Sequence, residues 1–340
     1  MKIPRLTRRG FLKSTGLAAG GLLLPPPPPD GLTRLPVGLG RAVRGLYVYS
    51  EPSFESDRLN FLATDSVFEV YGEVVSPDAL LNKRWHRVRR GFVHAGPVQP
   101  VNWHLQTATS DLPSTGALVE VTVPFAPARA GAGPGFRETA RFYYGTTHWV
   151  QQIAVDDAGT IWYGVLGDLT RTYAWVDGRQ LRRITADEVA PISPEVTDKH
   201  IEITLSDQMV RAYEGSTLVL EQRASCGTAL RQEGGRTIYS TPTGDHQVIS
   251  KRPSRHMAGG DLASADGYDL PGVPWVTYIH WWGVAIHGTF WHDDYGIPRS
   301  HGCINLPNAI AKWVYRWTTP TVPLADRWLD AKGTTVSVRD

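Results

Sequence analysis

The chain has 340 residues, of which 41% are hydrophobic, and a formal net charge of +2. This length suggests two or three domains, and the balanced charge excludes a protein that binds polyanions over its whole surface. Twelve tryptophans, thirteen tyrosines and 34 glycines favour a strand-rich fold with many turns over one built from long helices.

The first 24 residues resemble an export signal. Arg8 and Arg9 precede an apolar run at residues 17–24, which is similar to a twin-arginine signal; the alternative is a basic surface helix. The run is shorter than the roughly 20 apolar residues that cross a bilayer. No small-x-small cleavage site precedes Pro25, so an uncleaved signal would be the protein's contact with the membrane. We expect export to the periplasm or to the wall side of the cytoplasmic membrane.

A proline-rich linker follows at residues 25–40. It begins with five consecutive prolines, which predict a stiff polyproline II spacer.

Short strands alternate with turns from residue 41 to about 101. Residues 46–49, 66–71, 85–88 and 91–94 have strand patterns, and their order resembles a bacterial SH3-like module of the kind appended to wall enzymes. A strand followed by proline recurs at residues 121–127, and tryptophan-containing strands recur at 162–165 and 174–176. We therefore predict one SH3-like barrel at 41–101 and a second, from a degenerate repeat, at 116–185.

The densest basic run lies at residues 83–90. Its alternation around Trp85 and Val88 favours a strand with one solvated face. The alternative is a patch for anionic wall polymers that includes Arg87 and Arg89. Nucleic acid is not expected as a partner, because export removes the protein from it.

Residues 196–325 are predicted to form a mostly β domain with sheets packed face to face. Residues 200–205 alternate with period two and are followed by residues 208–213, a hairpin signal, and residues 218–223 supply a further strand. Residues 276–279 and 284–286 are apolar strands. Trp281 and Trp282 between them are expected to pack in the core, with stacking on sugar as the alternative. After Pro307, apolar residues at helical spacing predict an amphipathic helix.

Residues 251–274 are glycine-rich with little periodicity. They predict a loop, and a loop of this length in a compact domain is often a lid. We expect it to place Tyr268 or Met257 against the substrate.

Two blocks near the C-terminus carry the clearest chemistry. Residues 300–305 read Ser-His-Gly-Cys-Ile-Asn, and residues 285–289 read Ala-Ile-His-Gly-Thr. A cysteine attacks as its thiolate, so a thiol that titrates near 8.5 needs a nearby base or positive charge at neutral pH. His287 or His301 can be that base. Gly302 permits a tight turn that leaves peptide N–H groups free to face an oxyanion. The pattern predicts an acyl-transfer site.

These blocks resemble the signature of the L,D-transpeptidases, which act on bacterial peptidoglycan. Sixteen residues separate His287 from Cys303, and the segments 241–244 and 272–275 match as well. The resemblance implies that Cys303 is the nucleophile, that His287 is the general base and acid, and that the Gly288 carbonyl orients the imidazole. It further implies an oxyanion loop with His301, Gly302 and the Cys303 amide, and a substrate groove shaped by Ser300, Asn305 and Gly283.

Three other interpretations of Cys303 remain open. It could be a buried structural thiol, it could form a disulfide with Cys226, or it could join His287, His292 and His301 as ligands of a zinc hydrolase. No pair of histidines has the one-turn spacing of a metalloprotease helix. His292 and Asp294, in the spacer between the two blocks, are expected to be solvated loop residues.

The resemblance implies a reaction without metal or other cofactor. Cys303 would attack the carbonyl before the terminal D-amino acid of a stem tetrapeptide, and a second stem's amine would resolve the thioester into a cross-link. Carbapenems should acylate the same thiol. Water as acceptor would give a carboxypeptidase, a protein lysine would give lipoprotein attachment, and a degenerate domain would be a non-catalytic wall-binding protein.

Overall fold

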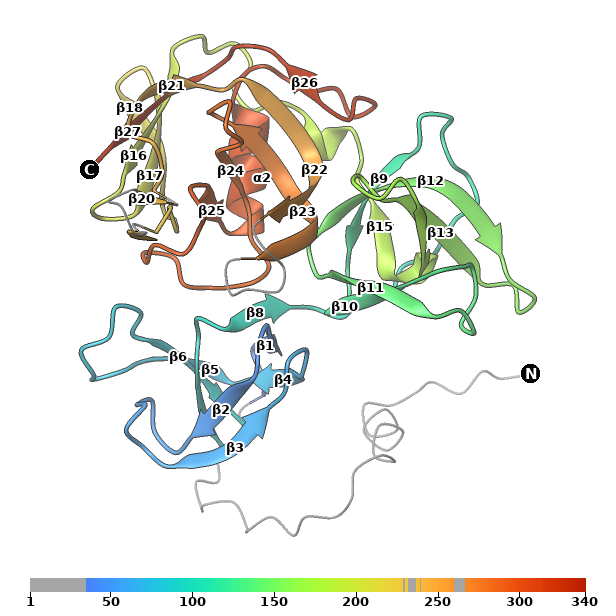
Figure 1. Ribbon diagram of the computed structural model, residues 1–340, viewed down its shortest axis with the longest axis horizontal. Helices are drawn as coiled ribbons and strands as arrows, with labels where there is room; N and C mark the ends of the chain where they lie inside the picture. The colour runs from blue at the N-terminus through green and yellow to red at the C-terminus, as the bar shows by residue number, and fades with distance from the viewer. Residues whose placement is uncertain (1–34, 229, 232–236, 239, 260–266) are drawn as a thin grey trace. The chain divides into compact units, whose positions relative to one another are not determined.

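The computed structural model describes residues 35–228, 230–231, 237–238, 240–259 and 267–340 (Figure 1). The predicted export signal, most of the proline-rich linker and the middle of the predicted lid lie outside these residues. No helix in the described part of the chain is long and apolar enough to cross a membrane. The prediction of a mainly β protein is confirmed.

The first module, residues 35–101, consists of short antiparallel strands. One sheet has the order β4-β1-β8 and the other β3-β2-β7-β6-β5. Buried Ala42, Val48 and Val93 form its small core, and Trp85 is fully buried. The strands are β1 (Gly38–Ala42), β2 (Leu46–Tyr49), β3 (Arg58–Leu62), β4 (Val67–Val70), β5 (Gly72–Val75), β6 (Arg84–Val88), β7 (Gly91–His94) and β8 (Val98–Val101).

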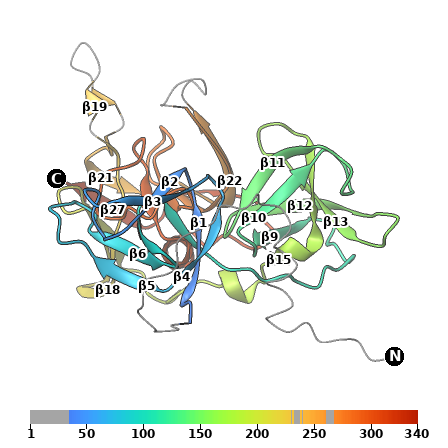
Figure 2. The same ribbon diagram turned by 90° about the horizontal axis from the view of Figure 1, so that it is seen from below.

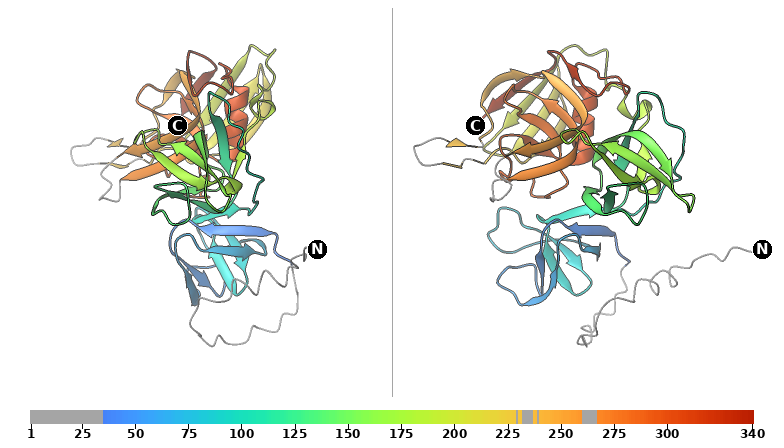
Figure 3. Two further views of the ribbon diagram at one scale, coloured as in Figure 1. Left: turned by 90° about the vertical axis from the view of Figure 1, so that its right-hand side faces the viewer. Right: turned by 45° about the vertical axis from the view of Figure 1, so that its right-hand side comes forward.

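The second module, residues 117–189, contains one curled sheet with the order β11-β10-β14-β13-β12-β9-β15 (Figure 3). The predicted strand at 121–127 is wrong, because residues 122–124 form the turn between two strands. The likeness of both modules to SH3 domains stays a prediction. The elements are β9 (Ala117–Val121), β10 (Phe125–Arg129), β11 (Glu138–Tyr143), β12 (Thr147–Val155), β13 (Ile161–Leu166), β14 (Tyr173–Asp177), η1 (Gly178–Gln180), β15 (Leu181–Arg183) and η2 (Asp187–Val189).

The C-terminal domain contains two five-stranded sheets. The first has the order β18-β17-β16-β27-β21, and the predicted hairpin is its β16–β17 pair. The second has the order β25-β24-β23-β22-β26. The strands are β16 (Lys199–Thr204), β17 (Met209–Glu214), β18 (Thr217–Arg223), β21 (Gly244–Gln247), β22 (Ser250–Gly259), β23 (Tyr268–Tyr278), β24 (Ala285–Gly288), β25 (Ile304–Leu306), β26 (Leu329–Asp330) and β27 (Thr335–Arg339), with a separate short pair, β19 (Leu230–Arg231) and β20 (Thr237–Ile238).

One hydrophobic core joins both sheets to the predicted amphipathic helix, α2 (Asn308–Trp317). Ile201 and Val210 come from the first sheet, Trp275 and Ile286 from the second, and Val314 from the helix. Pro307 stands at the helix N-cap, as expected for a residue that lacks an amide proton. The sheets therefore pack against each other with α2 completing the core.

The predicted lid loop at 251–274 is wrong for the residues that the structure describes. They form the long antiparallel pair β22–β23 of the second sheet, and Figure 2 shows β22 as an extended strand. A register shift between Arg255 and Met257 breaks the period-two pattern, and Pro253, Pro271 and Pro274 obscure it further. This irregularity is why the sequence resembled a loop.

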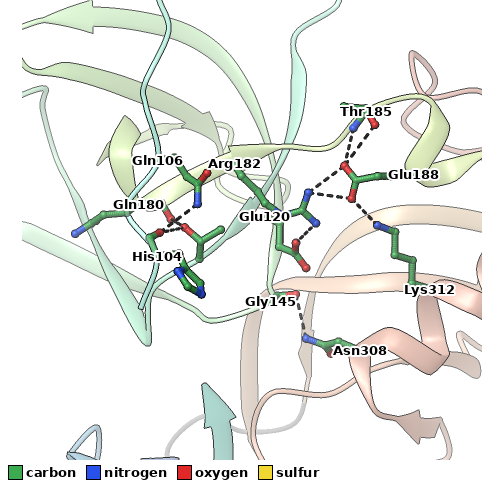
Figure 4. A network of polar contacts seen from close by, with 11 residues as sticks. His104, Gln106, Glu120, Gly145, Gln180, Arg182, Thr185, Glu188, Asn308 and Lys312 are labelled. Atoms are coloured by element: carbon green, nitrogen blue, oxygen red, sulfur yellow. Dashed lines mark hydrogen bonds and ion pairs between the residues drawn. The ribbon is translucent and has the colours of Figure 1, made fainter. Parts of the chain in front are cut away.

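The second module is joined to α2 by a polar network (Figure 4). The Glu188 carboxylate of η2 binds Lys312 of α2 at 2.9 Å and also accepts hydrogen bonds from Arg182. Asn308, at the first turn of α2, donates to the Gly145 carbonyl at 3.1 Å. The module is thereby anchored to the helix that supports the strand carrying His287.

Candidate active site

His287 and Cys303 lie on neighbouring parallel strands. In the β24–β25 pair His287 stands opposite Asn305, and Cys303 directly precedes β25. Because side chains two residues apart in a strand point to the same face, the thiol emerges on the face that carries His287. Parallel pairing of β24 with β25 thus makes neighbours of two segments that are sixteen residues apart in the sequence.

Cys303 is half-buried at the edge of an apolar cluster. Met257, Tyr278 and Trp291 pack in the same cluster, and the Sγ atom lies 3.7 Å from the Gly283 carbonyl oxygen, to which it donates. Burial raises the pKa of the thiol to about 11, although a hydrogen bond with the Ala285 backbone lowers it in part. At neutral pH the resting residue is therefore a protonated thiol.

His287 is almost fully buried and held in one orientation. Its Nδ1 lies 2.9 Å from the Gly288 carbonyl oxygen. A carbonyl only accepts, so Nδ1 carries the proton and Nε2 keeps its lone pair. Burial lowers the pKa of the imidazole to about 4. The ring also contacts Trp291, with centroids 5.7 Å apart. His287 is consequently a neutral base at physiological pH.

The loop before the thiol is fixed by two hydroxyl groups. The Ser300 hydroxyl donates to the Cys303 carbonyl and accepts from the Gly302 amide at 3.1 Å. The Thr241 hydroxyl donates to the Gly302 carbonyl at 3.0 Å. Gly302 has φ of 110°, a conformation that favours glycine. Since its amide already has an acceptor, it would have to leave Ser300 to serve an oxyanion.

Thr241 was not predicted as a site residue. It is 2% exposed and also accepts a hydrogen bond from the Gly227 amide at 2.9 Å. In the sequence, the one feature that pointed to Thr241 was its place in the Thr-Pro-Thr-Gly segment at residues 241–244, which resembles the family.

The predicted substrate residues differ in burial: Tyr268 and Met257 are partly buried, whereas Ser300 and Asn305 are buried. Tyr268, at the start of β23, packs against the exposed His301 with ring centroids 5.1 Å apart. Asn305 is 1% exposed and its amide lies 2.9 Å from His292 Nε2. The roles assigned to these residues, and to Met257, Ser300 and Gly283, stay predictions.

Two polar residues of the spacer between the two blocks, His292 and Asp294, are buried, so the expectation that they are solvated loop residues is wrong. His292 and Asp294 are 9% and 3% exposed. Asp294 accepts from Asn82 of the first module at 2.8 Å and pairs with Arg299 at 2.8 Å. The first module covers this segment, and nothing local in the sequence indicated that contact.

Gly96 shows how closely the first module approaches the segment between the two blocks, at Asp293 and Asp294. A Cβ atom at this position would lie 2.1 Å from the Asp294 carboxylate oxygen. The Gly96 carbonyl also accepts from the Asp293 amide at 2.8 Å. Only glycine permits this backbone approach.

The two cysteines are both free thiols. Cys226 is fully buried, its amide donates to the Gln208 side chain at 2.7 Å, and burial raises the pKa of its thiol to about 12. Across the described ranges, no group of three or more His, Cys, Asp or Glu side chains is placed to hold a metal ion. Of the two thiols, Cys303 alone is partly accessible.

Comparison with known proteins identifies the C-terminal domain. Residues 198–338 match the family of the L,D-transpeptidase catalytic domain. L,D-transpeptidase 2 of Mycobacterium tuberculosis is 26% identical over 124 residues, which are 33% of this chain and 29% of the relative. The probable L,D-transpeptidase 3 of the same species is 36% identical over 87 residues, or 24% and 32% of the two chains.

The chain therefore spans about a third of the length of these curated relatives. Among solved structures, the catalytic domain of an Enterococcus faecium L,D-transpeptidase has 28% identity, covers 42% of this chain and 96% of its own, and superposes with a TM-score of 0.31. The match to the L,D-transpeptidase catalytic domain covers residues 198–338, and the two modules that precede it in the chain lie outside the match.

Proposed function

We propose that this protein is an L,D-transpeptidase that forms peptidoglycan cross-links through a thioacyl-enzyme on Cys303. The observation that supports the proposal is the parallel pairing of β24 and β25, in which the neutral, oriented His287 lies opposite Asn305, two residues after the partly accessible Cys303, within the matching residues. The acyl donor is a stem tetrapeptide, and the terminal D-amino acid is the leaving group.

The resting protonation states determine how the first step proceeds. Since burial keeps both the thiol and the imidazole neutral, the proton moves as the sulfur attacks. The Cys303 sulfur bonds to the donor carbonyl carbon, and Nε2 of His287 takes the thiol proton. The C–N bond of the tetrahedral intermediate then breaks, and His287 protonates the leaving amine.

The second step uses the same residues in reverse. The side-chain amine of a second stem peptide attacks the thioester, His287 removes its proton, and the sulfur leaves and is reprotonated. Water in place of the amine gives an L,D-carboxypeptidase, and a protein lysine gives lipoprotein attachment. Backbone N–H groups of residues 301–303 would stabilise the oxyanion; removing one such donor typically costs about 3 kcal/mol.

Intact-mass spectrometry after incubation with a carbapenem tests the nucleophile. We expect one adduct on the wild type, the same adduct on Cys226→Ala, and none on Cys303→Ala. A tetrapeptide substrate then separates the acceptors, since dimer indicates transpeptidation and hydrolysed tripeptide indicates carboxypeptidation. If Cys303→Ala were still acylated, or the wild type were not, the proposal would fail and a wall-binding protein would become the better account.

The pH dependence of kcat/KM tests the neutral pair. The reaction needs His287 unprotonated in the free enzyme, so activity should fall only as the pH drops towards about 4. An acid limb near 6.5, the ordinary value for histidine, would contradict a buried neutral base.

We further propose export through residues 1–24 and attraction of the first module to anionic wall polymers. Arg87 is exposed on β6, and Arg89 follows this strand. Reversing both charges should weaken binding to isolated cell wall, and the loss should shrink at high salt. Unchanged binding would remove this role.

A further inference from the structure

Two adjacent tryptophans are the most exposed indoles in the part of the chain that the structure describes. Trp281 and Trp282 are 74% and 70% exposed, against 55% for Trp103. The expectation that they pack in the core is therefore wrong. Leaving two large apolar side chains in water forgoes the roughly 1.5–3 kcal/mol that burying each would contribute, and such exposure often marks an interaction surface.

The turn that carries them, residues 279–284, is well ordered by hydrogen bonds. The Ile279 amide donates to the Val284 carbonyl at 2.9 Å, and the Gly283 amide donates to the His280 carbonyl at 3.1 Å. The Trp282 amide donates to His280 Nδ1 at 3.2 Å. The exposed indoles are thus attached to a fixed backbone.

The rings themselves support one another. The two indoles have centroids 5.0 Å apart, and the His280 ring stacks on Trp281 at 5.8 Å with an interplanar angle of 22°. His246 packs edge-on against His280 at 5.5 Å. Burial lowers the pKa of His280, so this histidine is neutral at pH 7. The four rings form one aromatic surface.

This surface lies beside the proposed nucleophile. Trp282 is followed directly by Gly283, whose carbonyl oxygen is 3.7 Å from the Cys303 sulfur. With consecutive Cα atoms 3.8 Å apart, the Trp282 Cα is within roughly 10 Å of the sulfur. Three extended residues span at most about 10–11 Å. A stem peptide whose third carbonyl is at Cys303 can therefore place its first residue, and the sugar to which that residue is attached, at the indoles.

We infer that Trp281 and Trp282 form a stacking platform for a sugar ring of the glycan strand that carries the donor stem peptide. The inference rests on the proposed function and names a further part of its substrate. One face of a pyranose ring presents mainly C–H groups and matches the apolar face of an indole. Residues 279–284 contain no Asp, Glu, Lys or Arg, which suits an uncharged ligand.

The test compares two donors with the full-length protein. One donor is a free tetrapeptide, and the other is the same tetrapeptide on its disaccharide of N-acetylglucosamine and N-acetylmuramic acid. For Trp281→Ala/Trp282→Ala we expect kcat/KM to fall about tenfold with the disaccharide donor, mostly through KM, and less than twofold with the free peptide. Phenylalanine at both positions should restore most of the loss.

Trp103→Ala is the matched control, because Trp103 is also exposed but lies in the segment between β8 and β9. This variant should leave kcat/KM unchanged with both donors. An equal fall with both donors, or no fall, would overturn the inference, provided that thermal melting shows the variants to be folded.

A binding measurement separates this inference from the proposed reaction. If the wild type turns over neither donor, the proposed function fails, and peptide-free disaccharide is titrated while tryptophan fluorescence is recorded. A saturable change in the wild type that is lost in the double alanine variant supports the platform. Absence of that change overturns it.

Discussion

The two β-modules contact the catalytic domain through interfaces of different chemistry. The first module meets the spacer between His287 and Cys303 with buried charged groups, among them Arg41, which is 2% exposed. The second module meets α2 and the β22–β23 pair through half-exposed ion pairs and neutral hydrogen bonds, such as that from Thr147 to the Pro253 carbonyl.

This difference gives the two interfaces opposite responses to pH. Burial raises the pKa of Asp293, at the first interface, to about 6 in spite of its pair with the half-exposed Arg84. At the second interface burial also acts to raise the pKa of Glu188, but Lys312, the Thr185 amide and Arg182 outweigh it and lower the value to about 2. The charge of Asp293 therefore strains the first interface, whereas the charge of Glu188 stabilises the second.

The largest effect is expected at Arg41. Its guanidinium pairs with Asp65 at 2.7 Å and donates to the Phe290 carbonyl at 3.0 Å, and Asp65 also binds Arg141 of the second module. Arg41→Ala would leave a buried carboxylate without this partner, so we expect a loss of about 3–5 kcal/mol in the free energy of unfolding.

Urea unfolding would measure this loss. Replacing both partners, Arg41→Met with Asp65→Asn, should recover most of it, because no buried charge remains and asparagine tolerates the positive φ of 66° at position 65. A single variant as stable as the wild type would show that the first interface does not depend on this charge.

The next effect concerns Asp293. Its pKa is raised on folding, so between its ordinary value near 3.9 and about 6 the folded state binds more protons, and stability falls as the pH rises. The stability of Asp293→Asn relative to the wild type should increase by about 2 kcal/mol from pH 4 to pH 7. A difference that does not change with pH would contradict a buried, strained carboxylate.

Glu188 should show the reverse dependence. Its folded pKa is depressed, so its contribution is present above pH 4.5 and lost as the pH falls towards 2. Glu188→Gln should cost about 2 kcal/mol at pH 7, discounted for partial exposure, and almost nothing near pH 2. Asp168→Asn, which breaks a more exposed pair with Arg255, is the control and should cost less than about 1 kcal/mol.

The smallest effect is predicted for Thr147→Val. The hydroxyl donates to the Pro253 carbonyl at 2.7 Å, and the threonine is fully buried. Valine keeps the shape and removes one hydrogen bond, for a cost of about 1 kcal/mol that does not vary with pH. A cost that changed between pH 4 and pH 8 would mean that charge also governs the second interface at this point.

The sequence pointed to the candidate site through residue types and to its surroundings through periodicity. The blocks around His287 and Cys303 stood out because they place a thiol, imidazoles and flexible glycines close together in the chain, and the roles given to these residues stay predictions. Regular segments such as β16, β17 and α2 were also predicted, since their apolar residues follow the period of a strand or a helix.

Predictions failed where burial depends on residues far apart in the sequence. Asp294 looked like a loop residue because its partner Asn82 lies 212 positions earlier. Residues 251–274 looked like a loop because a register shift and three prolines disturbed the alternation of a real strand pair.

By itself, then, the sequence determined which residues are candidates for the reaction and the local periods of the elements around them, because both are properties of neighbouring residues. The tertiary structure decided which groups lose water. It buried His287, His292 and Asp294 and left Trp281 and Trp282 exposed. It also directed the Gly302 amide to a hydrogen bond with the Ser300 hydroxyl. Solvent exposure is set by what the rest of the chain places over a residue, and no local pattern encodes that.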